Sequence, residues 1–151
     1  GFHPHSTRMD EAIRRRLAGN LAAIQSENHE GIERWLKIAL EVSACIEKLV
    51  ADNRLTMAEL LDNHYTPIPG TDPLHVRARY LDAFEKSPLQ SIFDRTLTLD
   101  PRMLFCCAID RNGYIGVHNS KYAQPQRPND PKWNIAHARN RRIFDDRAGL
   151  T

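Results

Sequence analysis

The sequence predicts an α+β fold in which a long N-terminal helix and a helical first half pack on an antiparallel sheet. Apolar residues recur about every 3.5 residues over Leu17–Leu49, a period typical of a long helix. Asn112-Gly113 separates two β-prone runs, Met103–Ile109 and Tyr114–Asn119, and such a turn is typical of a β-hairpin. These patterns predict helices first and a sheet afterwards.

Length and composition favour one globular domain. The chain has 151 residues, 41% of them hydrophobic, which is enough to bury one core. Its 21 basic and 19 acidic residues leave a formal net charge of +2, and a charge so near balance argues against nucleic acid as a partner. No apolar run reaches the roughly 18 residues of a membrane helix, so we expect no membrane segment in this chain.

The three cysteines, Cys45, Cys106 and Cys107, do not suggest a disulfide framework. Cys106 and Cys107 are neighbours in an expected strand, so their side chains point to opposite faces and cannot pair. Reduced thiols are typical of the cytoplasm, where we expect the domain to lie, although a membrane anchor elsewhere in a parent receptor stays open. The sequence has no Cys-x-x-Cys motif that would indicate structural zinc.

The long helix is expected over residues 7–52, after a disordered start at residues 1–6. Thr7 is a suitable N-cap for it. Two alternatives stay open: one helix with a weak centre, or two helices broken near Asn28–Gly31, because glycine disfavours a helix interior. After Gly31 the apolar side is wide enough for a core or for a partner subunit. The seam consists of Leu17, Leu21, Ile24, Asn28, Gly31, Trp35, Ile38, Val42, Cys45 and Leu49.

Three shorter helices are expected in the middle of the chain. The first covers Leu55–Asn63 and begins with a capping box formed by Thr56 and Glu59. The other two begin at Asp72-Pro73 and Ser87-Pro88, where proline suits the first helical position, and they extend to Lys86 and about Leu97. Their expected buried faces are Val76, Tyr80, Leu81 and Phe84 in one helix, and Leu89, Ile92, Phe93 and Thr96 in the other.

The hairpin follows, and a last helix is expected after a proline-rich loop. That helix begins near Trp133-Asn134 and ends at Gly149, with Ile135, Ala138, Arg142 and Phe144 on or near its inner side. A two-stranded hairpin is marginal in water by itself. We therefore expect that helices cover it or that the natural domain continues with further strands, and its free edges would favour pairing with another chain.

A set of motifs distributed over residues 32–150 carries a resemblance to a known family. They are Leu60-Leu61-Asp62, residues 65–73, Asp100-Pro101-Arg102, residues 110–114, His118-Asn119, Trp133-Asn134 and residues 140–149. In this order they resemble the sensory domain of a group of bacterial methyl-accepting chemotaxis proteins. The resemblance implies a PAS/Cache-like domain over residues 53–151, with only the first hairpin of its sheet present and the C-terminal strands missing.

The same resemblance implies partners for the domain. It indicates a ligand-sensing module that forms a homodimer through the long helix and transmits its signal to a downstream chemotaxis signalling domain. Independently of the resemblance, His118 is the main candidate for chemistry, because it follows the turn and shares a strand face with Tyr114. It could bind a ligand, coordinate haem iron, or fix the strand to the next loop through Asn119.

Two arginines and a tryptophan complete the expected site. Arg141 and Arg142 each precede an aspartate by four residues, so they would form helical ion pairs or, alternatively, bind a carboxylate. Trp133 could be a core anchor or a ligand platform. The expected ligand-binding residues are Tyr114, His118, Asn119, Trp133, Asn140, Arg141 and Arg142.

The residues do not indicate an enzyme. Cys106 or Cys107 with His118 would be the one available pair of nucleophile and base, and burial in an apolar strand blunts a thiol. We therefore expect a sensor for a small polar or anionic molecule, with no resident cofactor and no metal. Two other classes stay open: a dimerisation or docking module without a small-molecule ligand, and a haem or redox sensor that uses His118 or the cysteines.

Overall fold

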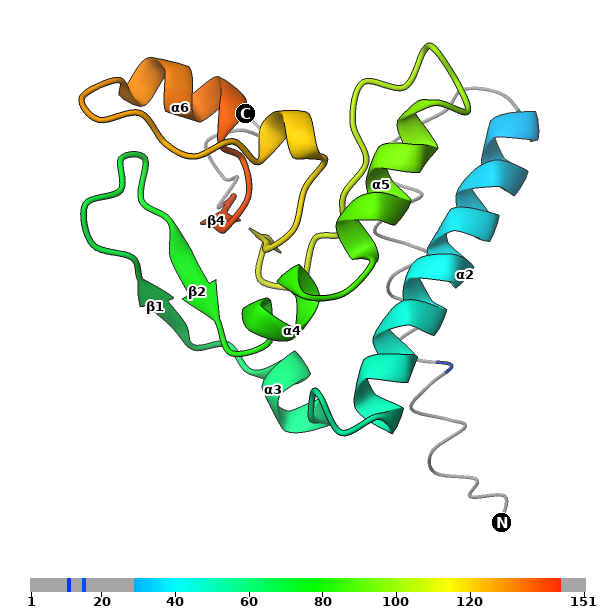
Figure 1. The fold of residues 1–151 in the computed structure, drawn as a ribbon. Helices are drawn as coiled ribbons and strands as arrows, with labels where there is room; N and C mark the ends of the chain where they lie inside the picture. Colours follow the sequence, from blue (N-terminus) through cyan, green and yellow to red (C-terminus); the bar gives the residue numbers. More distant parts are fainter. Residues whose placement is uncertain (1–10, 12–14, 16–28, 145–151) are drawn as a thin grey trace.

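The protein is described by a computed structural model that covers residue 11, residue 15 and residues 29–144. Within these residues the fold is mixed, with five α-helices and two small antiparallel sheets of two strands each, as an α+β class requires. Helix α2 lies beside α5 at one edge of the molecule, and the pair β1–β2 lies toward the opposite edge (Figure 1). The elements are α2 (His29–Ala51), α3 (Met57–Leu61), β1 (Tyr65–Pro67), β2 (Val76–Ala78), α4 (Leu81–Glu85), α5 (Leu89–Leu97), β3 (Tyr114–Ile115), the 3₁₀ turn η1 (Ser120–Tyr122), α6 (Pro131–His137) and β4 (Arg142–Ile143).

Helix α2 buries most of the described part of the predicted seam inside its own domain. Trp35, Ile38, Val42 and Leu49 belong to the hydrophobic core, to which β2, α4, α5 and β3 also contribute. Gly31 lies within α2, which is described from His29 onward. Asn28 and the seam before it, the N-cap Thr7 and the expected start at residues 1–6 lie outside the described residues. A second apolar stripe on α2 is exposed and consists of Ile32 (49% exposed), Leu36 (46%) and Leu40 (56%).

Two of the shorter helices follow their local sequence signals. At α3, the Glu59 N–H donates to Thr56 Oγ1 (3.1 Å) and the Thr56 N–H donates to Glu59 Oε1 (3.2 Å), so the predicted capping box is confirmed. At α5, Ser87 Oγ accepts a hydrogen bond from the Leu89 N–H (3.2 Å). The four residues expected on the inner face of α5 are all buried: Leu89, Ile92, Phe93 and Thr96.

The helix expected from Asp72-Pro73 to Lys86 is wrong in its first half. Val76–Ala78 forms strand β2 and pairs antiparallel with β1, so that Tyr65 lies opposite Ala78. Val76 and Ala78 are buried whereas Arg77 is exposed, which is the alternation of a strand with one covered face. The helix α4 begins at Leu81 instead. Both readings of this segment bury Val76, so its apolar spacing did not decide between them.

The hairpin of Met103–Ile109 with Tyr114–Asn119 is also wrong, although its turn is present. Gly113 has a φ of +82°, and its N–H donates to the Asp110 carbonyl (3.0 Å). Residues 103–109 contain no strand; the Cys106 N–H donates to Asn119 Oδ1 (2.6 Å) and not to a strand partner. Strand β3 pairs with β4, with Tyr114 opposite Ile143, so a segment distant in sequence takes the ladder bonds of this strand.

The last helix is shorter than expected. Asp130 caps α6 by accepting the Trp133 N–H (3.2 Å), and the helix ends at His137. Ala138 is buried as expected, whereas Ile135 is 52% exposed. The chain turns at Arg141, which has a φ of +59°, and enters β4, so Arg142 is not helical. The predicted helical ion pairs of the two arginines are therefore wrong; their expected partners Asp145 and Asp146, and the stop at Gly149, lie outside the described residues.

Candidate functional site

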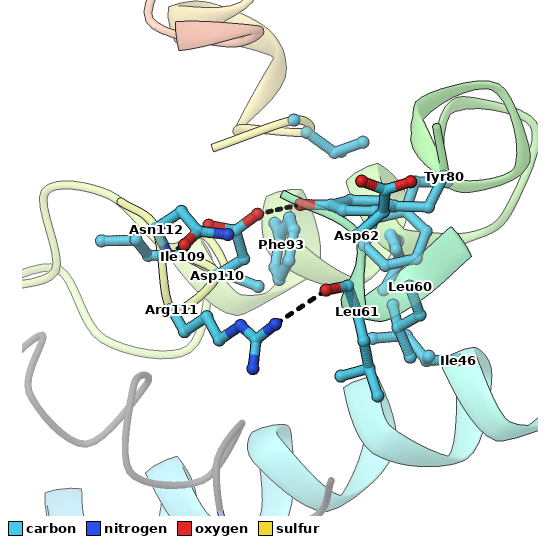
Figure 2. A pocket seen from close by; sticks show the side chains of 15 residues that line it. Ile46, Leu60, Leu61, Asp62, Tyr80, Phe93, Ile109, Asp110, Arg111 and Asn112 are labelled. Carbon is cyan, nitrogen blue, oxygen red and sulfur yellow. Dashed lines mark hydrogen bonds between the residues drawn. The ribbon is translucent and has the colours of Figure 1, made fainter. Parts of the chain in front are cut away.

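The candidate site is a pocket between the helices and the loop at residues 108–112 (Figure 2). Helix α2 contributes Ile46, and α3 contributes Leu60 and Leu61. The space between the lining residues is about 750 Å³, including the part that opens to solvent. The lining consists of Ile46, Leu60, Leu61, Asp62, Tyr80, Phe84, Leu89, Phe93, Ala108, Ile109, Asp110, Arg111, Asn112, Gly116 and Val117.

The inner wall of this pocket is apolar because core side chains from several elements meet there. Phe84 of α4, Leu89 and Phe93 of α5 and Val117 after β3 all belong to the buried core. Glycine at position 116 allows close packing of this wall, since a Cβ there would lie only 3.0 Å from Leu81 Cδ1. A wall of this composition suits the apolar part of a small molecule, and polar groups at the rim would orient it.

Asp110 organises the polar side of the pocket. Its Oδ2 accepts hydrogen bonds from the hydroxyls of Tyr65 (2.5 Å) and Tyr80 (2.8 Å), the second of which is drawn in Figure 2. Its Oδ1 accepts the backbone N–H groups of Asn112 (2.8 Å) and Tyr114 (3.0 Å). Four donors therefore saturate this carboxylate, and they join the turn to β1 and to the residue before α4.

The tyrosines around Asp110 form a packed cluster. The rings of Tyr65 and Tyr114 are 4.8 Å apart between centroids, and those of Tyr80 and Tyr114 are 6.0 Å apart. Burial raises the pKa of Tyr80, and the negative charge of Asp110 raises it further. Burial also raises the pKa of Tyr65, with the Asp110 hydrogen bond as the second cause. Both phenols consequently stay protonated as donors to the carboxylate.

Two further charged residues lie at the rim. Asp62 accepts hydrogen bonds from Arg79 (2.8 Å) and His64 (2.7 Å), and the Arg79 contact is the main cause of the lowered pKa of Asp62. Arg111 is exposed and donates from Nη2 to the Leu61 carbonyl (2.8 Å), as Figure 2 shows. Among the described residues, no carboxylate lies within ion-pair distance of the Arg111 guanidinium.

The structure places His118 and Asn119 in the core, away from this pocket. The Asn119 N–H donates to His118 Nδ1 (2.8 Å), and the ring lies between Phe105 and Tyr122. Asn119 Nδ2 donates to the Phe93 carbonyl (2.9 Å), so its amide joins α5 to the segment before the turn. Burial lowers the pKa of His118 to about 4, which keeps the ring neutral near pH 7.

His118 does not fit an iron ligand. Because Nδ1 accepts a hydrogen bond, the ring proton must lie on Nε2, whereas a ligating histidine normally donates from the nitrogen that does not bind metal. Burial raises the pKa of the Cys106 and Cys107 thiols to about 12, which opposes redox or nucleophilic use of either cysteine. No group of three metal-ligating side chains occurs within the described ranges.

Tyr114 and Trp133 also have packing roles. The Tyr114 hydroxyl donates to the Val76 carbonyl (2.8 Å) and thereby attaches β3 to β2. Burial raises its pKa to about 12. Trp133 stacks on His137 at 4.3 Å between centroids, and Arg127 lies 3.8 Å from the Trp133 ring centroid. Neither residue lines the pocket.

The three remaining predicted residues lie around β4. Arg141 forms a two-point ion pair with Glu85, from Nε (2.9 Å) and Nη2 (3.0 Å). Arg142 is half-buried, and its guanidinium lies 4.6 Å from the Phe144 ring centroid. Asn140 Oδ1 is a buried oxygen that has no hydrogen-bond partner among the described residues. Asn140, Arg141 and Arg142 are consecutive in the chain, and none of the seven predicted residues lines the pocket at residues 108–112.

Comparisons with protein-family models, with curated proteins and with solved structures gave no match for this chain. We therefore infer the candidate site from its geometry alone.

The sequence indicated Asp110 and Arg111 as parts of a turn and Tyr80 as a core residue, not as residues of a site. A signal for Asp110 was available, since aspartate before Asn-Gly favours side-chain bonds to the turn backbone. No helix in the described part of the chain is long and apolar enough to cross a membrane.

Proposed function

We propose that this domain is a ligand-sensing module of the chemotaxis-receptor type, which binds a small molecule in the pocket at residues 108–112. The observation that carries the proposal is that one pocket joins a polar, hydrogen-bonded turn to the long helix α2, through Asp110 on one side and Ile46 on the other. Such a pocket can couple occupancy to the position of a helix. The motif resemblance to the chemotaxis sensors supports the same function.

The proposed mechanism is non-catalytic. A ligand between the turn and α2 would favour one position of the turn relative to Ile46, and α2 would transmit that difference along its axis. A ligand shifts such an equilibrium only by its difference in affinity for the two states. Coupling of about 1–3 kcal/mol is typical for two linked sites and would be sufficient here.

Signal transmission requires a partner subunit, and we propose a homodimer through α2 that feeds a downstream signalling domain. The exposed stripe of Ile32, Leu36 and Leu40 is available for the second subunit, because the seam from Trp35 to Leu49 packs on the core of the domain. We also propose a cytoplasmic location, on the basis of the three free cysteines.

A screen for stabilising compounds tests the proposed function. Wild-type protein is heated with a library of small metabolites, and Tm is recorded for each compound, since a ligand that binds the folded state raises Tm. Ala108→Phe places a ring in the pocket and should remove the stabilisation. Ala44→Phe adds the same ring at an exposed position of α2 outside the pocket lining and should keep it. The proposal fails if no compound stabilises wild type more than Ala108→Phe.

A second candidate function is a dimerisation or docking module without a small-molecule ligand. The exposed stripe on α2 favours it, because three large apolar side chains at intervals of four residues form one face of a helix. Sedimentation equilibrium distinguishes the candidates when it is combined with the screen. A tight dimer that Leu36→Glu dissociates, with no stabilising compound in the screen, supports the docking module.

A further inference from the structure

We infer that the pocket takes an amphiphilic monocarboxylate, with the apolar body against the core wall and the carboxylate on Arg111. This inference rests on the proposed ligand-binding function of the same pocket and specifies the chemical class of the ligand. It follows from which charged groups at the rim already have partners and which do not.

The two carboxylates of the lining have little hydrogen-bonding capacity left for a cationic ligand. Asp110 receives four hydrogen bonds, two on each oxygen. Asp62 receives the His64 backbone N–H (2.8 Å) and ring nitrogen on Oδ1, and Arg79 on Oδ2. An amine would have to displace a hydrogen bond at Asp110, and at Asp62 it could use only the free position on Oδ2, beside the positively charged Arg79. The pocket therefore offers an amine little gain.

Arg111, in contrast to the two carboxylates, has hydrogen-bonding capacity left for a ligand. A guanidinium carries five N–H donors, and within the described residues Arg111 has one acceptor, the Leu61 carbonyl. That bond directs the side chain toward Leu61 of α3, as Figure 2 shows. Its remaining N–H groups have no acceptor among the described residues. A planar guanidinium of this kind can bind a carboxylate through two parallel bonds.

The apolar wall determines the rest of the ligand. Ile46, Phe84, Leu89 and Phe93 present carbon atoms to the pocket, and burial of apolar area there supplies a favourable free energy without direction. A small hydrophilic anion would leave this wall without a partner. A carboxylate with a hydrocarbon or aromatic body satisfies both the wall and Arg111.

Calorimetric titration tests the inference with two probes of equal length and opposite charge, octanoate and octylamine. We expect octanoate to bind wild type at least tenfold more tightly than octylamine. Arg111→Gln should weaken octanoate at least tenfold, which equals about 1.4 kcal/mol. Arg111→Lys keeps the charge but not the two-point geometry, so it should weaken octanoate less than Arg111→Gln does. Arg77→Gln, at an exposed arginine of β2 outside the lining, should change it less than twofold.

The outcomes separate the ligand class from the function. Equal or tighter binding of octylamine, or octanoate affinity that Arg111→Gln leaves unchanged, overturns the carboxylate inference. If neither probe binds, but another compound of the screen stabilises wild type and not Ala108→Phe, the inferred ligand class is wrong and the pocket still binds a ligand. If no compound of any class depends on the pocket, the proposed function fails together with this inference.

Discussion

Removal of the Asp110 carboxylate should strongly destabilise the domain. Asp110→Ala removes the acceptor of two phenols and two backbone N–H groups at once. Hydrogen bonds to an ionised group contribute about 1.5–3 kcal/mol each when buried. The Asn112 N–H is exposed and can turn to water, whereas Tyr80 is 3% exposed and loses its partner. We expect a total cost of about 3–5 kcal/mol.

Tyr80→Phe is the matched control for this prediction. It removes one donor, and Asp110 Oδ2 still accepts from Tyr65, so the cost should be about 1 kcal/mol. In the double variant, Asp110→Ala with Tyr80→Phe, position 80 has no hydroxyl that could lose its acceptor. The two costs should therefore add to more than the cost of the double variant, with a coupling of about 1–2 kcal/mol.

Urea unfolding followed by circular dichroism measures these free energies, provided that the m-values of the four proteins agree. The reasoning is refuted if Asp110→Ala costs less than about 1 kcal/mol, or if the double variant shows no coupling. Either result would mean that the carboxylate does not join the turn to Tyr80 in solution.

Two other predictions concern single residues. Gly113→Ala should lower the unfolding free energy clearly more than Gly70→Ala. Both glycines have positive φ, but a Cβ at Gly113 would lie 2.6 Å from the Phe144 carbonyl oxygen, whereas one at Gly70 would meet nothing within 4 Å. Equal losses of unfolding free energy in urea would contradict this prediction. Burial lowers the pKa of His118 from 6.5 to about 4, so the unfolded chain takes up a proton at a higher pH than the folded chain does. The unfolding free energy should therefore fall by up to about 1.4 kcal/mol per pH unit as the pH decreases from 6.5 toward 4. His118→Gln should reduce that slope. An unchanged slope in the variant would show that His118 is not buried in its neutral form.

The elements that the sequence predicted correctly are those with local causes. The capping box of Thr56 and the buried face of α5 depend on residues within one or two turns of each other. Strand β2 depends on pairing with β1, and β3 depends on a strand about thirty residues later. Spacing alone cannot select such partners. The segment from Val76 onward shows this, because its apolar positions fit a helix and a strand equally well.

The site was harder to predict than the fold for the same reason. Asp110 was visible as a turn residue, but its phenol partners come from β1 and from the residue before α4, which the hairpin β1–β2 positions. The predicted arginine at position 141 does form a two-point ion pair, and its partner is Glu85 of α4. In both cases the residue type indicated the interaction, and tertiary contacts determined the partner.

The central claim is that a small molecule binds between the turn at residues 108–112 and α2. A ¹⁵N–¹H correlation spectrum, recorded while the most stabilising compound of the screen is added, tests it most directly. We predict saturable shifts of the amides of residues 108–112, of residues 60–62 and of Ile46, which surround the pocket. Saturable shifts that centre on Trp133 and Arg142, with the amides of residues 108–112 unchanged, would contradict the account.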